Sequence, residues 1–433
     1  MKFQISARLS IVIFLLISMS LIFTNCGDDD VTEPPPPTYT KIVVKSSTDS
    51  TVIVGANVVL YNADNGESIT RELSGDDGIA EFENLASGTY YAEISANGFM
   101  QIPPKQVNPI PFSVSSTENF KQTYYLAKLE GTFGKIDGNI EPNMAGFLVI
   151  AHSAGSDAEY HTYSGPDGYF VIFNIPFGDY VVDAIKSGYQ STNQPEVSLT
   201  SSSSSATADI TLNTITGSTL NGMVTFLAVY NGIVDVSLLD NKSLSVVNGL
   251  TTVIDSNRVY SIENIPAGDY KAWASYENDG YVMDPDWIFK NPGALNISFE
   301  TDTTKELDFS VTGAITIISP SNPFDAIIPD TVEVDSLTFS WEAYPQSKEY
   351  IIEVRDINGN LVWGGFSESG EIYHDKITKE NISVEFNFDG SAVEELKSGN
   401  IYQWKIYSDD DAQQGIQRLL SSSEDLMGIF FVK

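Results

Sequence analysis

The sequence predicts an all-β protein made of tandem antiparallel β-sandwich domains, and two observations carry this prediction. The chain contains 21 tyrosines and 23 phenylalanines, with many β-branched residues, asparagines and glycines, a composition that favours strands and turns over helices. A seven-residue motif also recurs every ninety residues, as NLASGTY from Asn84, NIPFGDY from Asn174 and NIPAGDY from Asn264. Apolar residues alternate with polar ones on either side of each copy, which is typical of strands with one buried face.

Each copy of the motif stands in a longer unit of repeated pattern. A turn dipeptide precedes it at a constant distance and predicts a tight hairpin turn. Each unit holds about seven short strands in roughly 90 residues, which suits a small sandwich and is too long for a solenoid repeat. We therefore expect separate globular units joined by short linkers, with the motif serving as strand and turn structure. The turn dipeptides are Asp77-Gly78, Asp167-Gly168 and Asn257-Arg258.

The order of these features resembles the carboxypeptidase regulatory-like domain: Asp-Gly, an apolar strand, Asn-(Leu/Ile)-X-X-Gly-X-Tyr, an alternating strand, and Gly-(Tyr/Phe). The resemblance implies three transthyretin-like (prealbumin-like) domains, at residues 41–128, 129–214 and 215–313. It also implies a non-catalytic role, since this domain occurs beside peptidases and in many bacterial surface proteins. The third copy has Arg258 in place of the turn glycine and an insertion before Gly280.

Residues 314–433 carry a different pattern. Three alternating aromatic and aliphatic runs resemble a fibronectin type III-like or immunoglobulin-like sandwich. The runs are Leu337, Phe339 and Trp341; Tyr350, Ile352 and Val354; and Tyr402, Trp404 and Ile406.

The amino-terminal segment predicts export and anchoring. A basic start and the apolar run Ile11–Phe23 are typical of a signal peptide over residues 1–25. Cys26, the chain's single cysteine, follows at once, and this arrangement resembles the lipobox of bacterial lipoproteins, which implies a lipid on Cys26. The alternative is an ordinary cleaved signal followed by a chance cysteine. Residues 26–40 then form an acidic, proline-rich tether that resembles signals for the outer face of the bacterial outer membrane.

The sequence contains few candidate residues for catalysis or for binding a cofactor or metal. The formal net charge of −35 argues against nucleic-acid binding, which needs lysine and arginine. No catalytic residue or cofactor is predicted, because no zinc-peptidase helix motif, nucleophile elbow or phosphate-binding loop occurs. His152 and His161 flank a predicted hairpin and could form a metal pair, although ordinary strand histidines are the favoured interpretation. Acidic turns leave structural calcium as an alternative to plain solvated loops.

One loop, Tyr276–Phe289, is the candidate ligand contact. It sets Tyr276, Tyr281 and Trp287 beside Asp284 and Asp286. Aromatic faces with nearby carboxylates can hold sugar rings, whereas the alternative is that these rings complete the edge of a core.

Together these features predict a lipid-anchored cell-surface protein without enzymatic activity. It would act as a binding, adhesion or spacer module, with a glycan, a host protein or an envelope component as partner. The second hypothesis is an accessory lipoprotein of an outer-membrane uptake or export complex, and the third is an unrecognised carboxylate-based hydrolase.

Overall fold

The computed structural model describes residues 37–103, 109–227, 232–275, 280–290, 293, 295–322, 329–356, 359–367, 371–410, 419–424 and 426–433. Residues 38–433 form one compact unit. The predicted signal peptide and Cys26 lie outside the described residues.

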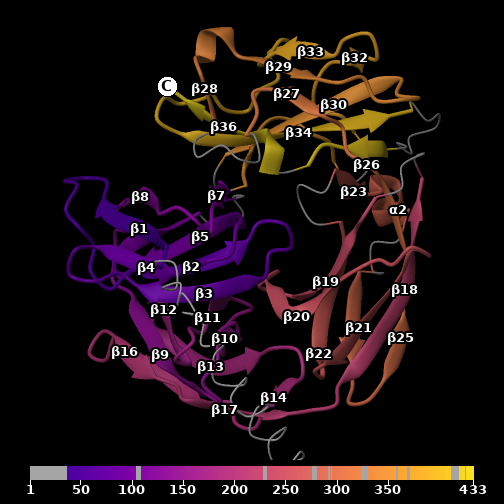
Figure 1. Ribbon diagram of the computed structural model, residues 1–433. Coiled ribbons are helices and arrows are strands. Elements are labelled where there is room, and N and C mark those ends of the chain that lie inside the picture. Colours follow the sequence, from indigo (N-terminus) through magenta and orange to yellow (C-terminus); the bar gives the residue numbers. More distant parts are fainter. Residues whose placement is uncertain are drawn as a thin grey trace, which may run out of the picture. The chain divides into compact units, whose positions relative to one another are not determined.

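Strands dominate the described part of the chain, which confirms the predicted all-β sandwich architecture (Figure 1). Its strands make eight sheets, and four clusters of buried apolar side chains lie between pairs of these sheets. Alternation in the sequence explains the arrangement, because every second side chain of a strand points to the same face. In β5, for example, Tyr90, Ala92 and Ile94 are buried in this way.

The first sandwich pairs the sheet β4-β1-β8 with the sheet β3-β2-β5-β6, to which β7 adds through β5. Its strands are β1 (Tyr39–Ser46), β2 (Asn57–Asn62), β3 (Ser68–Leu73), β4 (Ile79–Glu83), β5 (Gly88–Ala96), β6 (Phe99–Ile102), β7 (Phe112–Val114) and β8 (Phe120–Leu126).

The second sandwich pairs the sheet β12-β9-β17-β14, extended by β16, with the sheet β11-β10-β13-β15. Its strands are β9 (Gly134–Glu141), β10 (Leu148–Ser153), β11 (Glu159–Tyr163), β12 (Tyr169–Ile175), β13 (Gly178–Ile185), β14 (Tyr189–Ser191), β15 (Glu196–Leu199), β16 (Ser205–Thr207) and β17 (Ile210–Thr214).

The third sandwich pairs the sheet β21-β18-β26-β23, extended by β25, with the sheet β20-β19-β22-β24. Its elements are β18 (Ser218–Phe226), β19 (Asp235–Asp240), β20 (Val246–Val253), β21 (Val259–Ile265), β22 (Gly268–Ala274), β23 (Tyr281–Met283), the helix α2 (Pro285–Lys290), β24 (Asn296–Phe299), β25 (Thr304–Glu306) and β26 (Phe309–Gly313).

The fourth sandwich pairs the sheet β27-β29-β33 with the sheet β28-β36-β34-β30-β31, to which β32 and β35 add. Its elements are β27 (Ile317–Ser319), β28 (Asp330–Val332), the 3-10 helix η1 (Val334–Ser336), β29 (Thr338–Trp341), β30 (Glu349–Asp356), β31 (Leu361–Gly364), β32 (Ile377–Thr378), β33 (Ser383–Glu385), β34 (Ile401–Asp409), β35 (Leu419–Ser422), η2 (Leu426–Gly428) and β36 (Ile429–Val432). Trp341, Trp363 and Trp404 are fully buried in its core.

The first three sandwiches share a topology that includes parallel pairing of the first strand. In each, the first strand pairs in parallel with the last, as β1 with β8, β9 with β17 and β18 with β26. The turn dipeptides reverse the chain as predicted, with positive φ at Gly78 (72°), Gly168 (77°) and Arg258 (66°). They are not hairpin turns, however, because the strands on either side belong to different sheets. A turn dipeptide fixes a local reversal and leaves the partner of the next strand open.

The repeated motif has a common local structure. Its asparagine adopts a left-handed backbone conformation, with φ of 53° at Asn84, 60° at Asn174 and 58° at Asn264, as asparagine tolerates. The hydroxyl of the motif tyrosine donates a hydrogen bond back across the turn, to a carbonyl four residues earlier. The pairs are Tyr90 to Ala86 at 2.9 Å, Tyr180 to Pro176 at 2.8 Å, and Tyr270 to Pro266 at 2.8 Å. The motif is therefore turn structure, as the sequence predicts.

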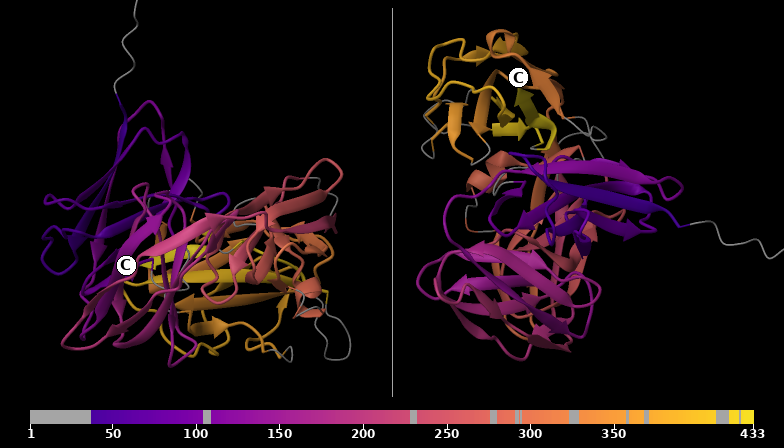
Figure 2. Two further views of the ribbon diagram at one scale, coloured as in Figure 1. Left: turned by 90° about the horizontal axis from the view of Figure 1, so that it is seen from below. Right: turned by 90° about the vertical axis from the view of Figure 1, so that its left-hand side faces the viewer.

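The first three sandwiches also pack against one another, which the sequence does not predict. The core cluster of the third includes buried side chains from the other two, among them Tyr61 of the first and Tyr163 of the second. Asn174 joins the second sandwich to the first, because its Nδ2 donates to the carbonyls of Ala96 (2.9 Å) and Phe99 (2.8 Å). Asn174 thus stabilises the contact between two sandwiches as well as its own turn. Figure 2 shows the strands from two further sides.

Candidate functional site

The predicted ligand loop contains a short helix where the sequence predicts a loop. Helix α2 (Pro285–Lys290) follows β23 directly. Asp284 caps it: its carboxylate accepts a hydrogen bond from the Asp286 amide at 3.2 Å, and its carbonyl accepts one from the Ile288 amide at 3.1 Å. A capping aspartate followed by proline at the first helical position is a helix-start signal that could have been found from the sequence.

An open cleft of about 720 Å³ lies beside this helix. Tyr281, Asp284 and Asp286 line one part of it, and Glu342 and Tyr344 line another. The chain segment Thr312–Thr316, which leads from the third sandwich into the fourth, also lines it. The structure thus brings three of the five predicted contact residues to one cleft.

The other two predicted residues differ in position. Tyr276 lies outside the described residues. Trp287 packs against the core of the third sandwich, with its ring centroid 5.9 Å from that of Phe309, and it does not line the cleft. This placement agrees with the alternative that the aromatic ring completes a core edge.

Tyrosine 344 is the aromatic residue of the cleft that sequence reasoning missed. Its hydroxyl shares a hydrogen bond of 2.6 Å with the Thr312 hydroxyl, and its amide donates to the Tyr350 hydroxyl at 2.8 Å. These bonds fix Tyr344 between the last strand of the third sandwich and β30 of the fourth. No local pattern connects residue 344 with residue 281, so only the fold could reveal the pair.

The cleft carries three acidic side chains, Asp284, Asp286 and Glu342. Asp284 is 6% exposed, and its own amide donates to the Ser310 carbonyl at 2.8 Å, which holds the acid against β26. Tyr281 packs its ring edge-on against Phe226, with centroids 5.3 Å apart. Among the described residues that line the cleft there is no histidine, cysteine or serine. The arrangement offers hydrogen-bond acceptors and aromatic surface, as a binding site requires.

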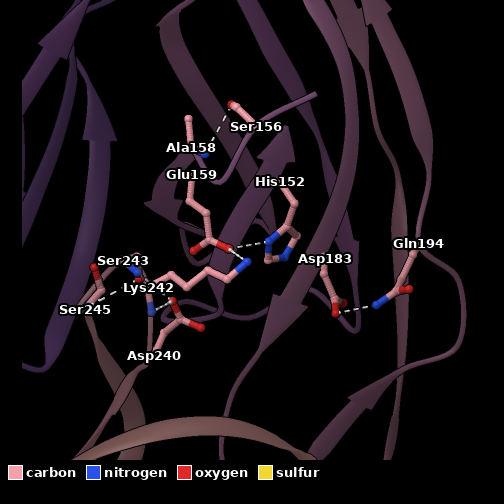
Figure 3. Close-up of polar contacts among 10 residues, drawn as sticks. All are labelled: His152, Ser156, Ala158, Glu159, Asp183, Gln194, Asp240, Lys242, Ser243 and Ser245. Carbon is pink, nitrogen blue, oxygen red and sulfur yellow. Dashed lines mark hydrogen bonds and ion pairs between the residues drawn. The ribbon is translucent and has the colours of Figure 1, made fainter. Parts of the chain in front are cut away.

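The two histidines considered as a metal pair do not face each other across the hairpin. His152 is paired with Glu159, whereas His161 is paired with Ile150. The His152 Nδ1 lies 2.6 Å from the Glu159 Oε1, and the Lys242 Nζ lies 3.6 Å from the same oxygen (Figure 3). The Glu159 side chain is only 5% exposed, and the hydrogen bond with His152 and the Lys242 ammonium compensate a carboxylate held in a dry environment. In the described part of the chain, no group of three or more His, Cys, Asp or Glu side chains could hold a metal ion.

A known domain family matches part of the sequence, within the second sandwich. Residues 138–213 match the carboxypeptidase regulatory-like domain. This segment runs from β9 through β17 and contains the second copy of the repeated motif. The carboxypeptidase regulatory-like domain is thus present in the chain at the copy with the motif NIPFGDY.

Comparison with other proteins adds little beyond this domain. No curated protein matches the chain. Among solved structures, the TIE protein of Bacillus anthracis is similar at 13% identity over 64% of this chain and 50% of that one, with a TM-score of 0.18. BcpA, the major pilin subunit of Bacillus cereus, is similar at 13% identity over 64% of this chain and 99% of its own, with a TM-score of 0.19.

Two B repeat units of the collagen-binding protein of Staphylococcus aureus are similar at 11% identity over 92% of this chain and 98% of theirs, with a TM-score of 0.18. The chain spans only half the length of the Bacillus anthracis protein. At such scores the likeness carries no conclusion about function.

Proposed function

We propose that the protein is a non-catalytic cell-surface binding protein, lipid-anchored through Cys26, which holds a glycan in the cleft beside α2. The observation that carries the proposal is the convergence of Tyr281, Tyr344, Asp286 and Glu342 on one open cleft. Aromatic faces can stack on the C–H faces of a sugar ring, and carboxylates accept hydrogen bonds from its hydroxyls. A cleft of about 720 Å³ is also within the usual size range of ligand sites.

The anchor rests on the sequence. The apolar run, Cys26 and the acidic tether follow one another in the order of a bacterial outer-membrane lipoprotein. Several acyl chains on one terminus would hold a protein on a membrane durably, since each buried methylene contributes about 0.8 kcal/mol. Among the described residues no helix is long and apolar enough to span a bilayer.

The division into domains belongs to the same proposal. Residues 41–128, 129–214 and 215–313 would be regulatory-like domains, and residues 314–433 a fibronectin type III-like domain. The four core clusters support this division, because each sandwich contributes most of the side chains of one cluster.

A glycan array probed with the mature protein tests the binding role. Wild-type protein should bind a subset of glycans, and the double variant Asp286→Asn, Glu342→Gln should lose at least about tenfold in affinity. A control variant, Glu263→Gln with Asp269→Asn, removes the same number of charges from exposed positions of the third sandwich and should bind normally. Equal binding by both variants would reject the cleft as the site.

Anchoring is tested in growing cells. Labelled palmitate should enter the wild-type protein and not a Cys26→Ala variant, and external protease should remove the wild-type protein from intact cells. Incorporation that is equal in the two proteins would exclude lipidation at Cys26.

A further inference from the structure

A second pocket, of about 390 Å³, lies where the first three sandwiches meet. Strands β2 and β5 of the first sandwich contribute Tyr61, Tyr91 and Glu93 to its lining. Strand β11 of the second contributes His161, and β22 of the third contributes Trp273. The pocket shares no lining residue with the cleft beside α2.

Strand register explains why these side chains converge. Tyr61 is paired with Tyr91 across β2 and β5, so the two tyrosines lie on the same face of their sheet. Trp273 is paired with Ser237 across β22 and β19, and both line the pocket. These residues lie on the sheet faces turned away from the cores of their own sandwiches. The packing of three sandwiches brings three outer faces together around one pocket.

Aromatic rings form the walls of this pocket. The rings of Tyr61 and Tyr91 are stacked, with centroids 4.8 Å apart and planes within 8° of each other. Tyr163, which also lines the pocket, stands edge-on to Tyr61 at 5.4 Å. The indole nitrogen of Trp273 donates to the Ser275 carbonyl at 3.1 Å, so the polar edge of this ring is already satisfied.

Polar groups are interspersed with the rings. Glu93, His161 and Lys271 line the pocket together with Ser237 and Ser245. The Lys271 ammonium lies 5.6 Å from the centroid of the Trp273 ring. Burial raises the pKa of Glu93 to about 7, against a hydrogen bond from Tyr61 that lowers it. The carboxyl of Glu93 therefore exists in both protonation states near neutral pH and can donate or accept.

The charge balance restricts the ligand. The lining contains one acidic and one basic side chain, Glu93 and Lys271, so a ligand of either charge would meet one group of its own sign. A neutral ligand with one apolar face and many hydroxyls suits both the rings and the polar groups. We infer that this pocket binds a single neutral sugar residue, stacked on the Tyr91 and Trp273 rings and hydrogen-bonded to Glu93, His161 and Lys271. The site belongs to the assembled sandwiches and does not rest on the cleft proposed above.

Saturation-transfer NMR with the mature protein tests this inference. The probes are D-glucose, D-galactose, D-mannose and N-acetyl-D-glucosamine, with choline as a cationic probe. At least one sugar should bind, and Tyr91→Leu and Glu93→Gln should each weaken it about tenfold, through loss of stacking and of a hydrogen bond. Tyr125→Leu removes an exposed tyrosine from the same sandwich and should leave binding unchanged.

The outcomes separate this pocket from the cleft. Sugar binding that is lost in Tyr91→Leu and Glu93→Gln, and kept in the cleft variant Asp286→Asn, Glu342→Gln, supports the inference. Three results would overturn it: no binding of any of the four sugars, binding of choline instead, or sugar binding that depends on the cleft residues alone. Glu93→Gln preserves the shape of the side chain, so its effect on sugar affinity can be interpreted even where Tyr91→Leu disturbs the fold.

Discussion

The substitution Asn248→Ala should loosen the contact between the first and third sandwiches. Asn248 is 7% exposed and lies on β20 of the third sandwich. Its Nδ2 donates to the Ser68 carbonyl at 2.7 Å and to the Ser68 hydroxyl at 2.9 Å, and its Oδ1 accepts from the Ser68 amide at 3.0 Å. One side chain thus satisfies every polar group of a buried serine at the start of β3.

The size of the effect follows from these three bonds. A hydrogen bond contributes roughly 1 kcal/mol net, and a buried donor or acceptor left without a partner costs about 1–3 kcal/mol. Alanine leaves the amide and carbonyl of Ser68 without these partners in a buried place. We expect the contact to be weakened by about 3 kcal/mol, which corresponds to roughly a hundredfold in the opening equilibrium.

Hydrogen exchange read by mass spectrometry measures this opening locally. Amides of Ser68–Leu73 and Val246–Val253 should exchange roughly a hundredfold faster in Asn248→Ala than in wild type. The matched control is Asn139→Ala, at an exposed asparagine of β9, which should change nothing in these peptides. Exchange in Asn248→Ala that stays within about threefold of the control would refute the view that Asn248 holds the two sandwiches together.

Three further predictions concern stability. Gly138→Ala should destabilise by about 3 kcal/mol in urea unfolding, because its Cβ would lie 2.2 Å from the Ala208 carbonyl oxygen, whereas Gly155→Ala, with nothing within 4 Å, should be neutral. Tyr270→Phe should cost about 1 kcal/mol through loss of the bond to Pro266, and an unchanged midpoint would contradict that role. Burial, aided by Asp64 and Glu67, raises the pKa of Asp235 to about 6, and burial raises that of Glu93 to about 7. Because both folded-state pKa values exceed the unfolded ones, this stabilisation is complete at low pH and is lost as pH rises through 6 and 7. Urea midpoints should therefore fall from pH 5 to pH 8, and Asp235→Asn with Glu93→Gln should flatten that dependence.

The fold class could be predicted because its determinants are local. Alternation over β5 and the turn at Gly78 depend on neighbours within a few residues, and both appear in the sequence as spacing. The pairing of strands does not depend on near neighbours, because β1 pairs with β8, which lies about eighty residues later in the sequence. Neither strand carries a sequence pattern that identifies its partner, and for this reason the prediction of a hairpin at Asp77-Gly78 is wrong.

The candidate site could be predicted only in part for the same reason. Tyr281, Asp284 and Asp286 are neighbours in the sequence, and the structure keeps them together at the cleft. Trp287 is turned toward Phe309, because helix α2 places successive side chains on different sides, which a loop interpretation ignores. Tyr344 comes from another sandwich, so its approach depends on packing between sandwiches.

Packing between sandwiches also links the proposed sugar pocket to the contact that Asn248 stabilises. The pocket that contains Tyr61, Tyr91 and Trp273 exists only while three sandwiches are in contact, and Asn248 strengthens that contact without lining the pocket. A ligand that binds the assembled state alone stabilises it, and by reciprocity a weakened assembly binds the ligand less tightly. Asn248→Ala should therefore reduce sugar binding in proportion to the fraction of molecules it opens. If the contact is so stable that this fraction remains small, amide hydrogen exchange will become faster while the affinity for the sugar is unchanged. The pocket is then preorganised. If affinity falls as well, the sugar itself contributes to holding the sandwiches together.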